Sequence, residues 1–154
     1  MIIRPARRED VPAIAALAAQ FAHYMRELGD TTPLQLDAQT LMRDGFGPNP
    51  AFSGLVAESA GVTGEVVGYL LHHPGYDTDA ARRLLFVVDL YVAVAARGQG
   101  IATALMAEAR QLAVGGGAAQ LVWTVDRRNT RALRFYEGLG AVYADELALL
   151  YMDA

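Results

Sequence analysis

The segment 84–112 constrains the fold more than any other part of this chain. Residues 84–94 form an apolar, β-branched run that a single charge, Asp89, interrupts, which is typical of a central strand. A short turn with one arginine and two glycines follows, and apolar residues then recur at helical spacing from Ile101. A buried strand that passes through such a turn directly into a helix predicts an α/β protein.

The other elements predict how this unit is completed. The patterns favour strands over 1–6, 52–58, 65–72, 120–125, 141–143 and 147–152, with a hairpin-like turn at 60–64. They favour helices over 10–28, 37–44, 101–112 and 130–139. We expect a mixed, mostly antiparallel central sheet of about six or seven strands, flanked by about four helices, in a single domain over 1–154.

Composition removes several classes of function. Thirteen Lys plus Arg against 17 Asp plus Glu give a net charge of −4, which opposes binding to nucleic acid through its phosphates. The absence of cysteine excludes a disulfide framework, a thiolate metal site and a cysteine nucleophile. The three histidines lack metal-ligand spacing, so we expect no metal. No uncharged run reaches the ~20 residues that cross a bilayer and no secretory leader is visible, so we expect a cytoplasmic protein.

The turn after the central strand has the features of an anion-binding loop. It reads Arg97-Gly98-Gln99-Gly100-Ile101-Ala102. Backbone N–H groups at a helix N-terminus lack intrahelical partners, and glycines let a phosphate approach them closely. The lysine of the Walker pattern is missing, and Thr103 stands where a dinucleotide loop needs its third glycine. A phosphate cradle of another kind and a tight turn without ligand are the two alternatives.

Two separate motifs resemble those of the GNAT acetyltransferases. The turn matches R-x-x-G-x-G/A through Arg97, Gly100 and Ala102. Further along, Asn129 precedes the segment 132–141, which reads ALRFYEGLGA and is similar to the family's second motif. The order of elements over almost the whole chain also resembles this family.

A narrower resemblance is to the spermidine/spermine and thialysine acetyltransferase branch. It rests on residues 44–47 and 76–77 and on the run 84–92. That branch carries an acidic pair in the middle of its central strand, where this chain has Val88-Asp89 and so keeps one acid. The resemblance implies a small primary amine, such as a polyamine, a diamine or a lysine-like amino acid, as the acetyl acceptor.

The resemblance implies an enzyme that moves acetyl from acetyl-CoA to an amine by direct attack in a ternary complex. The central strand would pair with the pantetheine arm, and the glycine loop would wrap the pyrophosphate. Asn129 would contact the pantetheine, although it also fits as a plain helix N-cap. The acetyl-CoA ligands implied are Leu90, Tyr91, Val92, Arg97, Gly98, Gln99, Gly100, Ile101, Ala102, Thr103, Asn129 and Tyr136.

Two residues are catalytic candidates. Tyr136 resembles the group that protonates the departing sulfur, with an ordinary packed aromatic as the alternative. Asp89 is the candidate proton acceptor or amine anchor, because a carboxylate in an apolar strand is costly unless it has a role. Simple alternation places Val87, Asp89 and Tyr91 on one face of the strand. A surface-facing or arginine-paired Asp89 is the alternative.

The acceptor side is predicted more coarsely. Tyr24, Glu27 and Asp30 near the end of the first helix, with Asp77 and Asp79 in the loop before the central strand, could form an acidic mouth for a cationic amine, or could simply be solvated. The substrate-binding residues expected are Tyr24, Glu27, Asp77 and Asp89. A peptide or protein amine is an alternative acceptor, and a non-catalytic acyl-CoA-binding domain is a third interpretation. Closing strands such as 147–151 often pair across a dimer in the family that the chain resembles, so the resemblance implies a possible homodimer.

Overall fold

The computed structural model describes residues 1–61 and 64–153. Val62 and Thr63, in the turn expected between the second and third strands, lie outside the described residues. The chain divides into two compact units, Met1–Thr124 and Val125–Ala154, which are described separately. The single domain over 1–154 stays a prediction.

The first unit is built on one five-stranded sheet in the order β1-β2-β3-β4-β5. The strands β1 to β4 pair in antiparallel fashion, and β5 runs parallel to β4. Their bounds are β1 Ile2–Pro5, β2 Ser53–Glu58, β3 Val66–Asp77, β4 Arg82–Val92 and β5 Ala118–Val122. The mixed, mostly antiparallel sheet is therefore confirmed.

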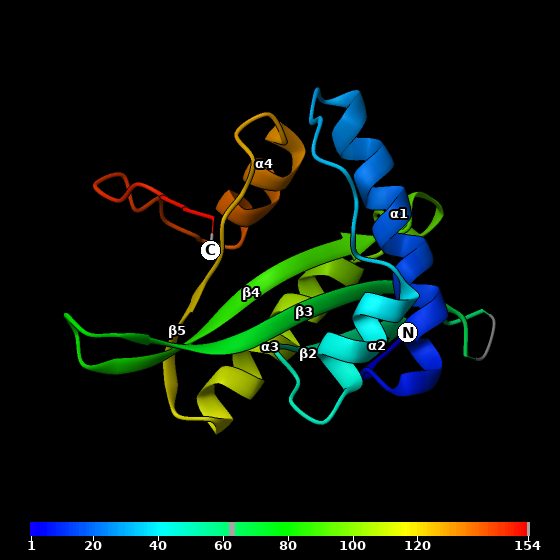
Figure 1. Cartoon of the computed structure of the whole chain (residues 1–154), viewed down its shortest axis with the longest axis horizontal. Coiled ribbons are helices and arrows are strands. Elements are labelled where there is room, and N and C mark those ends of the chain that lie inside the picture. Colours follow the sequence, from blue (N-terminus) through cyan, green and yellow to red (C-terminus); the bar gives the residue numbers. More distant parts are fainter. Residues whose placement is uncertain (62–63, 154) are drawn as a thin grey trace. The chain divides into compact units, whose positions relative to one another are not determined.

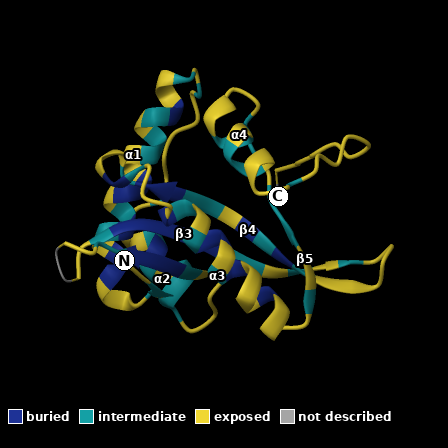
Figure 2. Ribbon diagram, turned by 180° about the vertical axis from the view of Figure 1, so that it is seen from behind, coloured by how far each residue is buried: buried dark blue, intermediate teal, exposed yellow. Residues whose placement is uncertain are grey.

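Helices cover both faces of this sheet (Figure 1). The first two, α1 (Val11–Glu27) and α2 (Ala38–Phe46), lie on one face, and α3 (Ile101–Gly115) lies on the other. Two short 3-10 helices, η1 (Arg8–Asp10) and η2 (Val94–Ala96), precede α1 and the glycine loop. The core beneath α1 and α2 contains, among others, Ile14, Leu17, Leu41, Tyr69, Leu71 and Tyr91. Figure 2 shows the first half of β3 buried, while the end of the β3–β4 hairpin is exposed.

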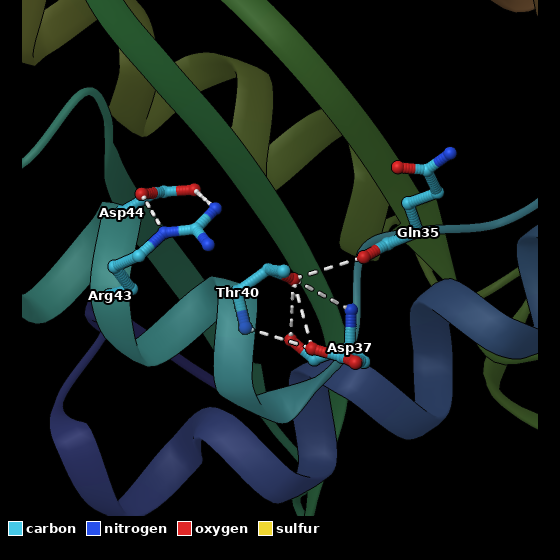
Figure 3. Close-up of polar contacts among 5 residues, drawn as sticks. All are labelled: Gln35, Asp37, Thr40, Arg43 and Asp44. Atoms are coloured by element: carbon cyan, nitrogen blue, oxygen red, sulfur yellow. Dashed lines mark hydrogen bonds and ion pairs between the residues drawn. The ribbon is translucent and has the colours of Figure 1, made fainter.

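The start of α2 is fixed by a reciprocal cap (Figure 3). Oδ1 of Asp37 accepts from the N–H of Thr40 at 2.8 Å, and Oγ1 of Thr40 accepts from the N–H of Asp37 at 2.9 Å. Two donors without intrahelical partners are thereby satisfied. In the same helix Arg43 forms an ion pair with Asp44 at 2.6 Å. The helix expected over 37–44 is confirmed, and it extends two residues further.

The β3–β4 hairpin is longer than the sequence predicts. Residues 74–77, expected to be loop, continue β3, and Pro74 pairs with Leu85. Beyond His72, β3 has lost its β2 partner, so this part of it pairs on one side only. Proline is tolerated there, because a residue without an N–H costs little on a strand edge.

The second unit carries α4 (Thr130–Gly138) and a C-terminal segment without strands in its described part, up to residue 153. The strands expected over 141–143 and 147–152 are therefore wrong. Apolar composition alone does not make a strand, because a strand also needs a ladder partner and a surface to pack on. These residues lack that packing, as the 93% exposure of Val142 and the 94% exposure of Tyr151 show.

Candidate functional site

A β-bulge in β4 sets the direction of the site residues. Leu71 pairs with Asp89, but the next residue of β3, His72, pairs with Val87, so Val88 is an extra residue. Paired residues share a face, so Asp89 lies with Leu71 on the α1/α2 side and Val87 lies on the opposite side. The prediction that Val87 and Asp89 share a face is wrong, because the bulge reverses the alternation between them.

Beyond the bulge, β4 separates from β5. The last residues paired between these two strands are Phe86 and Val122, and β4 continues to Val92 paired with β3 only. Within the described ranges, no strand pairs with residues 87–92 on that side of β4. An unpaired edge presents backbone N–H and C=O groups that an extended ligand can use. Leu90, Tyr91 and Val92, the predicted pantetheine ligands, lie on this stretch.

The glycine loop leads from this stretch into α3. Gly98 and Gly100 have φ of 78° and 76°, the left-handed region that side chains rarely adopt. A Cβ on either glycine would meet nothing within 4 Å, so there is open space in front of the loop. Gly68 of β3 lets the helix begin close to the sheet, because a Cβ there would come within 3.3 Å of the side chain of Ile101.

The other predicted loop residues differ in exposure. Gln99 and Thr103 are exposed, Ala102 is half-buried and Ile101 is buried. The side chain of Ile101 therefore belongs to the core, and only its backbone is available to a ligand. The first N–H groups of α3 have no intrahelical partners, because these lie one turn before the helix begins. This geometry fits the predicted anion-binding loop.

Arg97 turns toward the protein core at the end of β4. Its guanidinium carbon lies 5.5 Å from the ring centre of Tyr24 and 5.3 Å from that of Tyr91. Its Nε donates to the carbonyl of Val92 at 3.1 Å. Cation–π contacts and this hydrogen bond connect α1, β4 and the loop. A contact between the Arg97 side chain and a pyrophosphate stays a prediction.

Asp89 is held by two donors. The hydroxyl of Tyr69 donates to Oδ2 at 2.5 Å, and the N–H of Leu90 donates to Oδ1 at 2.9 Å. Burial raises the pKa of Asp89 to about 6, although both hydrogen bonds favour the ionised form and oppose this rise. The carboxylate therefore titrates close to neutral pH.

Tyr69 is the site residue that sequence reasoning missed. The partner expected for a structural Asp89 was an arginine, and the structure supplies a tyrosine from the adjacent strand. A signal was present: an isolated charge in an apolar strand requires a polar neighbour. In the run VVGYLL at 66–71, Tyr69 is the one polar side chain.

The predicted acidic mouth is not assembled in one place. Glu27 pairs with His23 at 3.5 Å on an exposed surface of α1. Asp77 pairs with Arg82 at 3.2 Å and accepts from the N–H groups of the following hairpin turn. Asp77 is six residues beyond Leu71, the partner of Asp89, which is about 20 Å along a strand. Tyr24 lies instead beside Arg97.

The second unit holds the remaining candidates. Asn129 is buried and caps α4, because its side chain accepts from the N–H of Ala132 at 3.2 Å. Tyr136 lies on the same helix, with its ring centre 5.0 Å from that of Phe135. The helix cap that the sequence favours at Asn129 is therefore present, and the roles of Asn129 and Tyr136 toward acetyl-CoA stay predictions.

Among residues 1–61 and 64–153, no three His, Cys, Asp or Glu side chains are grouped so that they could hold a metal ion. The helices formed by these residues are too short or too polar to cross a membrane.

Comparison with known proteins decides the family. Residues 15–141 match the model of the Acetyltransferase (GNAT) family. The chain belongs to the GNAT family. It is 34% identical over 146 residues to the thialysine N-epsilon-acetyltransferase of Bos taurus, which covers 92% of this chain and 84% of that protein. It is 30% identical over 144 residues to a human spermidine/spermine N(1)-acetyltransferase-like protein, covering 91% of this chain but 20% of that protein.

Solved structures agree on the fold. A variant of the BH1408 protein of Bacillus halodurans superimposes with a TM-score of 0.82 at 23% identity, covering 99% of this chain and 100% of the other. The chain of 154 residues is thus a GNAT acyltransferase. Both the family resemblance and the fold class that its sequence predicts are confirmed. The strand count differs, with five strands in the described residues.

The position of Arg97 makes a direct prediction. We expect Arg97→Lys to lower the free energy of unfolding by about 1 kcal/mol, because an ammonium stacks less well on two rings and loses the Nε donor. Chemical denaturation measures this difference. Arg110→Lys, on the exposed surface of α3, is the matched control and should stay within about 0.5 kcal/mol of the wild type. Equal stability of all three proteins would show that Arg97 does not connect these elements.

Proposed function

We propose that this GNAT enzyme transfers acetyl from acetyl-CoA to the primary amine of a small, lysine-like or polyamine-like molecule. The observation that carries the proposal is the unpaired edge of β4 between the bulge and the glycine loop. The names of the relatives support the acceptor class, since the bovine relative is a thialysine N-epsilon-acetyltransferase.

Acetyl-CoA fits this stretch of the first unit. The edge of β4 offers the backbone pairing that an extended pantetheine arm needs, and Leu90, Tyr91 and Val92 are its proposed ligands. The left-handed glycines and the first turn of α3 form a cradle for the pyrophosphate. The net charge of the chain, −4, repels an anionic ligand. Its binding therefore depends on the backbone dipoles of the glycine loop and the first turn of α3.

The acetyl acceptor must lose a proton during the reaction. The amine nitrogen attacks the thioester carbon, so a C–N bond forms and the C–S bond breaks. We propose that Asp89 accepts the proton from nitrogen and that Tyr136 donates a proton to the departing sulfur. Asp89 then releases its proton to solvent, and Tyr136 regains one from solvent. The near-neutral pKa of Asp89, about 6, suits this role, because both of its protonation states are then accessible at the working pH.

A panel of acceptors tests the proposal. Release of free CoA from acetyl-CoA is followed with thialysine, lysine, diamines, spermidine and a lysine-containing peptide, and the products are identified by mass spectrometry. We expect turnover with the small amines and little with the peptide. Turnover with the peptide alone would replace the proposed acceptor class. Binding of acetyl-CoA without turnover of any amine would contradict the proposal.

The role assigned to Tyr136 is tested by Tyr136→Phe. We expect kcat to fall by about 10²-fold with little change in the KM of acetyl-CoA, because the hydroxyl acts on the departing sulfur and not on ground-state binding. Tyr143→Phe is the matched control in the same unit, where the hydroxyl donates to Glu137, and it should keep kcat within about threefold. If Tyr136→Phe and the control behave alike, the role is refuted.

We also propose that the enzyme is a homodimer joined through its C-terminal segment. Exposed apolar side chains gather at 147–152, and they include Leu147, Leu149, Leu150, Tyr151 and Met152. Such a concentration of exposed apolar groups is typical of an interface. The segment has no strand partner among the described residues of its own chain, and a second copy would supply the backbone ladder that a strand needs.

Oligomeric state checks this assembly. Light scattering at micromolar concentration should give twice the chain mass for the wild type and a monomer for the double variant Leu149→Lys, Tyr151→Lys, because charges cannot be buried there without partners. Val114→Lys, an equally exposed apolar position at the end of α3, should remain dimeric. A monomeric wild type would overturn the proposal.

A further inference from the structure

Tyr69 places a polar group in the centre of the core beneath α1. Its side chain is fully buried, at 0% exposure, among Ile14, Leu17 and other apolar neighbours. A buried hydroxyl is costly unless it forms a hydrogen bond. The hydroxyl of Tyr69 meets this requirement by donating to Oδ2 of Asp89.

The geometry fixes the carboxylate from two directions. Tyr69 approaches Oδ2 from the neighbouring strand, while the N–H of Leu90 approaches Oδ1 from within β4. Tyr69 pairs with Tyr91, and Asp89 pairs with Leu71, so the hydroxyl reaches across the sheet diagonally. The bulge at Val88 allows this contact, because it turns Asp89 toward the face on which Tyr69 lies.

Few other titratable groups face this carboxylate. On the sheet, Tyr91 and His73 share its face, and Arg97 and Tyr24 lie beyond the Tyr91 ring. The buried residues of α1 are Val11, Ile14, Leu17, Ala18 and Met25, none of which titrates. The buried residue of α2 is Leu41. Tyr69 is therefore the group best placed to control the ionisation of Asp89.

Tyr69 itself keeps its proton. Burial and the negative charge of Asp89 raise the Tyr69 pKa well above its ordinary value. The hydroxyl is therefore a permanent donor at physiological pH, and it stabilises the ionised carboxylate more than the protonated one. Its removal is expected to raise the pKa of Asp89, because the hydrogen bond from Tyr69 lowers that pKa.

We propose that Tyr69 is a positioning residue of the acetylation site: it holds the Asp89 carboxylate oriented and ionised, so that Asp89 can take the proton from the acceptor nitrogen. Tyr69 donates a hydrogen bond throughout and gives up no proton. Asp89 gains one proton in each turnover and returns it to solvent. This inference rests on the proposed amine acetylation.

The variant Tyr69→Phe removes one oxygen and leaves the ring in place. We expect the acid limb of the kcat/KM profile, measured with one acceptor for all variants, to move up by about one pH unit. If Tyr69 has only a packing role, Tyr69→Phe would lower stability or kcat without moving the acid limb. Tyr76→Phe, on the exposed part of β3, is the matched control and should keep the acid limb of the wild type. An unmoved limb in Tyr69→Phe would overturn the proposal.

A second readout needs no turnover. Carboxyl ¹³C NMR follows the titration of Asp89, with Asp89→Asn identifying its signal, and the midpoint should be higher in Tyr69→Phe than in the wild type. If Tyr69→Phe does not fold, 3-fluorotyrosine at position 69 supplies a stronger donor of nearly the same shape and should move the midpoint down. Unchanged midpoints would contradict the role of Tyr69. Absence of acetylation in the wild type, with shifted midpoints, would contradict the proposed function instead.

Discussion

The carboxylate of Asp89 lies inside an otherwise apolar strand, and the arrangement of β3 and β4 depends on how it is accommodated. Asp89 is half-buried, and a carboxylate that has lost part of its water is stable only if hydrogen bonds replace that water. The bulge at Val88 turns the carboxylate toward the α1/α2 face, where the hydroxyl of Tyr69 is available. The desolvation that remains brings the pKa of Asp89 close to neutral. The bulge at Val88 therefore provides Asp89 with a hydrogen-bond partner in the core and leaves its carboxylate able to exchange protons near neutral pH.

The same stretch of β4 is the proposed site of the other substrate, acetyl-CoA. Pairing with β5 stops at Phe86, just before the bulge at Val88. One edge of β4 is therefore without a strand partner at the bulge. Arg97 then connects the end of β4 with α1 by packing on Tyr91 and Tyr24. These contacts hold the glycine loop at the end of the strand. The backbone groups proposed to bind acetyl-CoA and the carboxylate proposed to act on the amine thus lie within a few residues of each other along β4.

Local patterns predict the parts of this protein that local physics controls. The position of the glycine loop, the helices and the order of the strands along the chain up to β5 follow from residue spacing, and Gly98 and Gly100 have the positive φ that glycine allows. The bulge at Val88 could not be predicted, because it depends on the register between two strands. Tyr69 was missed as the partner of Asp89 for the same reason. Residues 141–143 and 147–152 were predicted as strands from their composition, but a strand also requires a partner. The distance between Asp77 and Asp89 was not predicted, because the β3–β4 hairpin is longer than the sequence indicates.

Hydrogen exchange with and without acetyl-CoA tests the central claim most directly, since it reports on each backbone amide of β4 and the loop. If the unpaired edge of β4 and the start of α3 hold the acyl-CoA, amides within 88–92 and 98–103 should exchange more slowly with the ligand, because bound amides open less often. The amides of β1 and α2 should exchange at the same rate in both states. Slower exchange confined to other elements, or equal exchange throughout at saturating acetyl-CoA, would contradict this placement of the site.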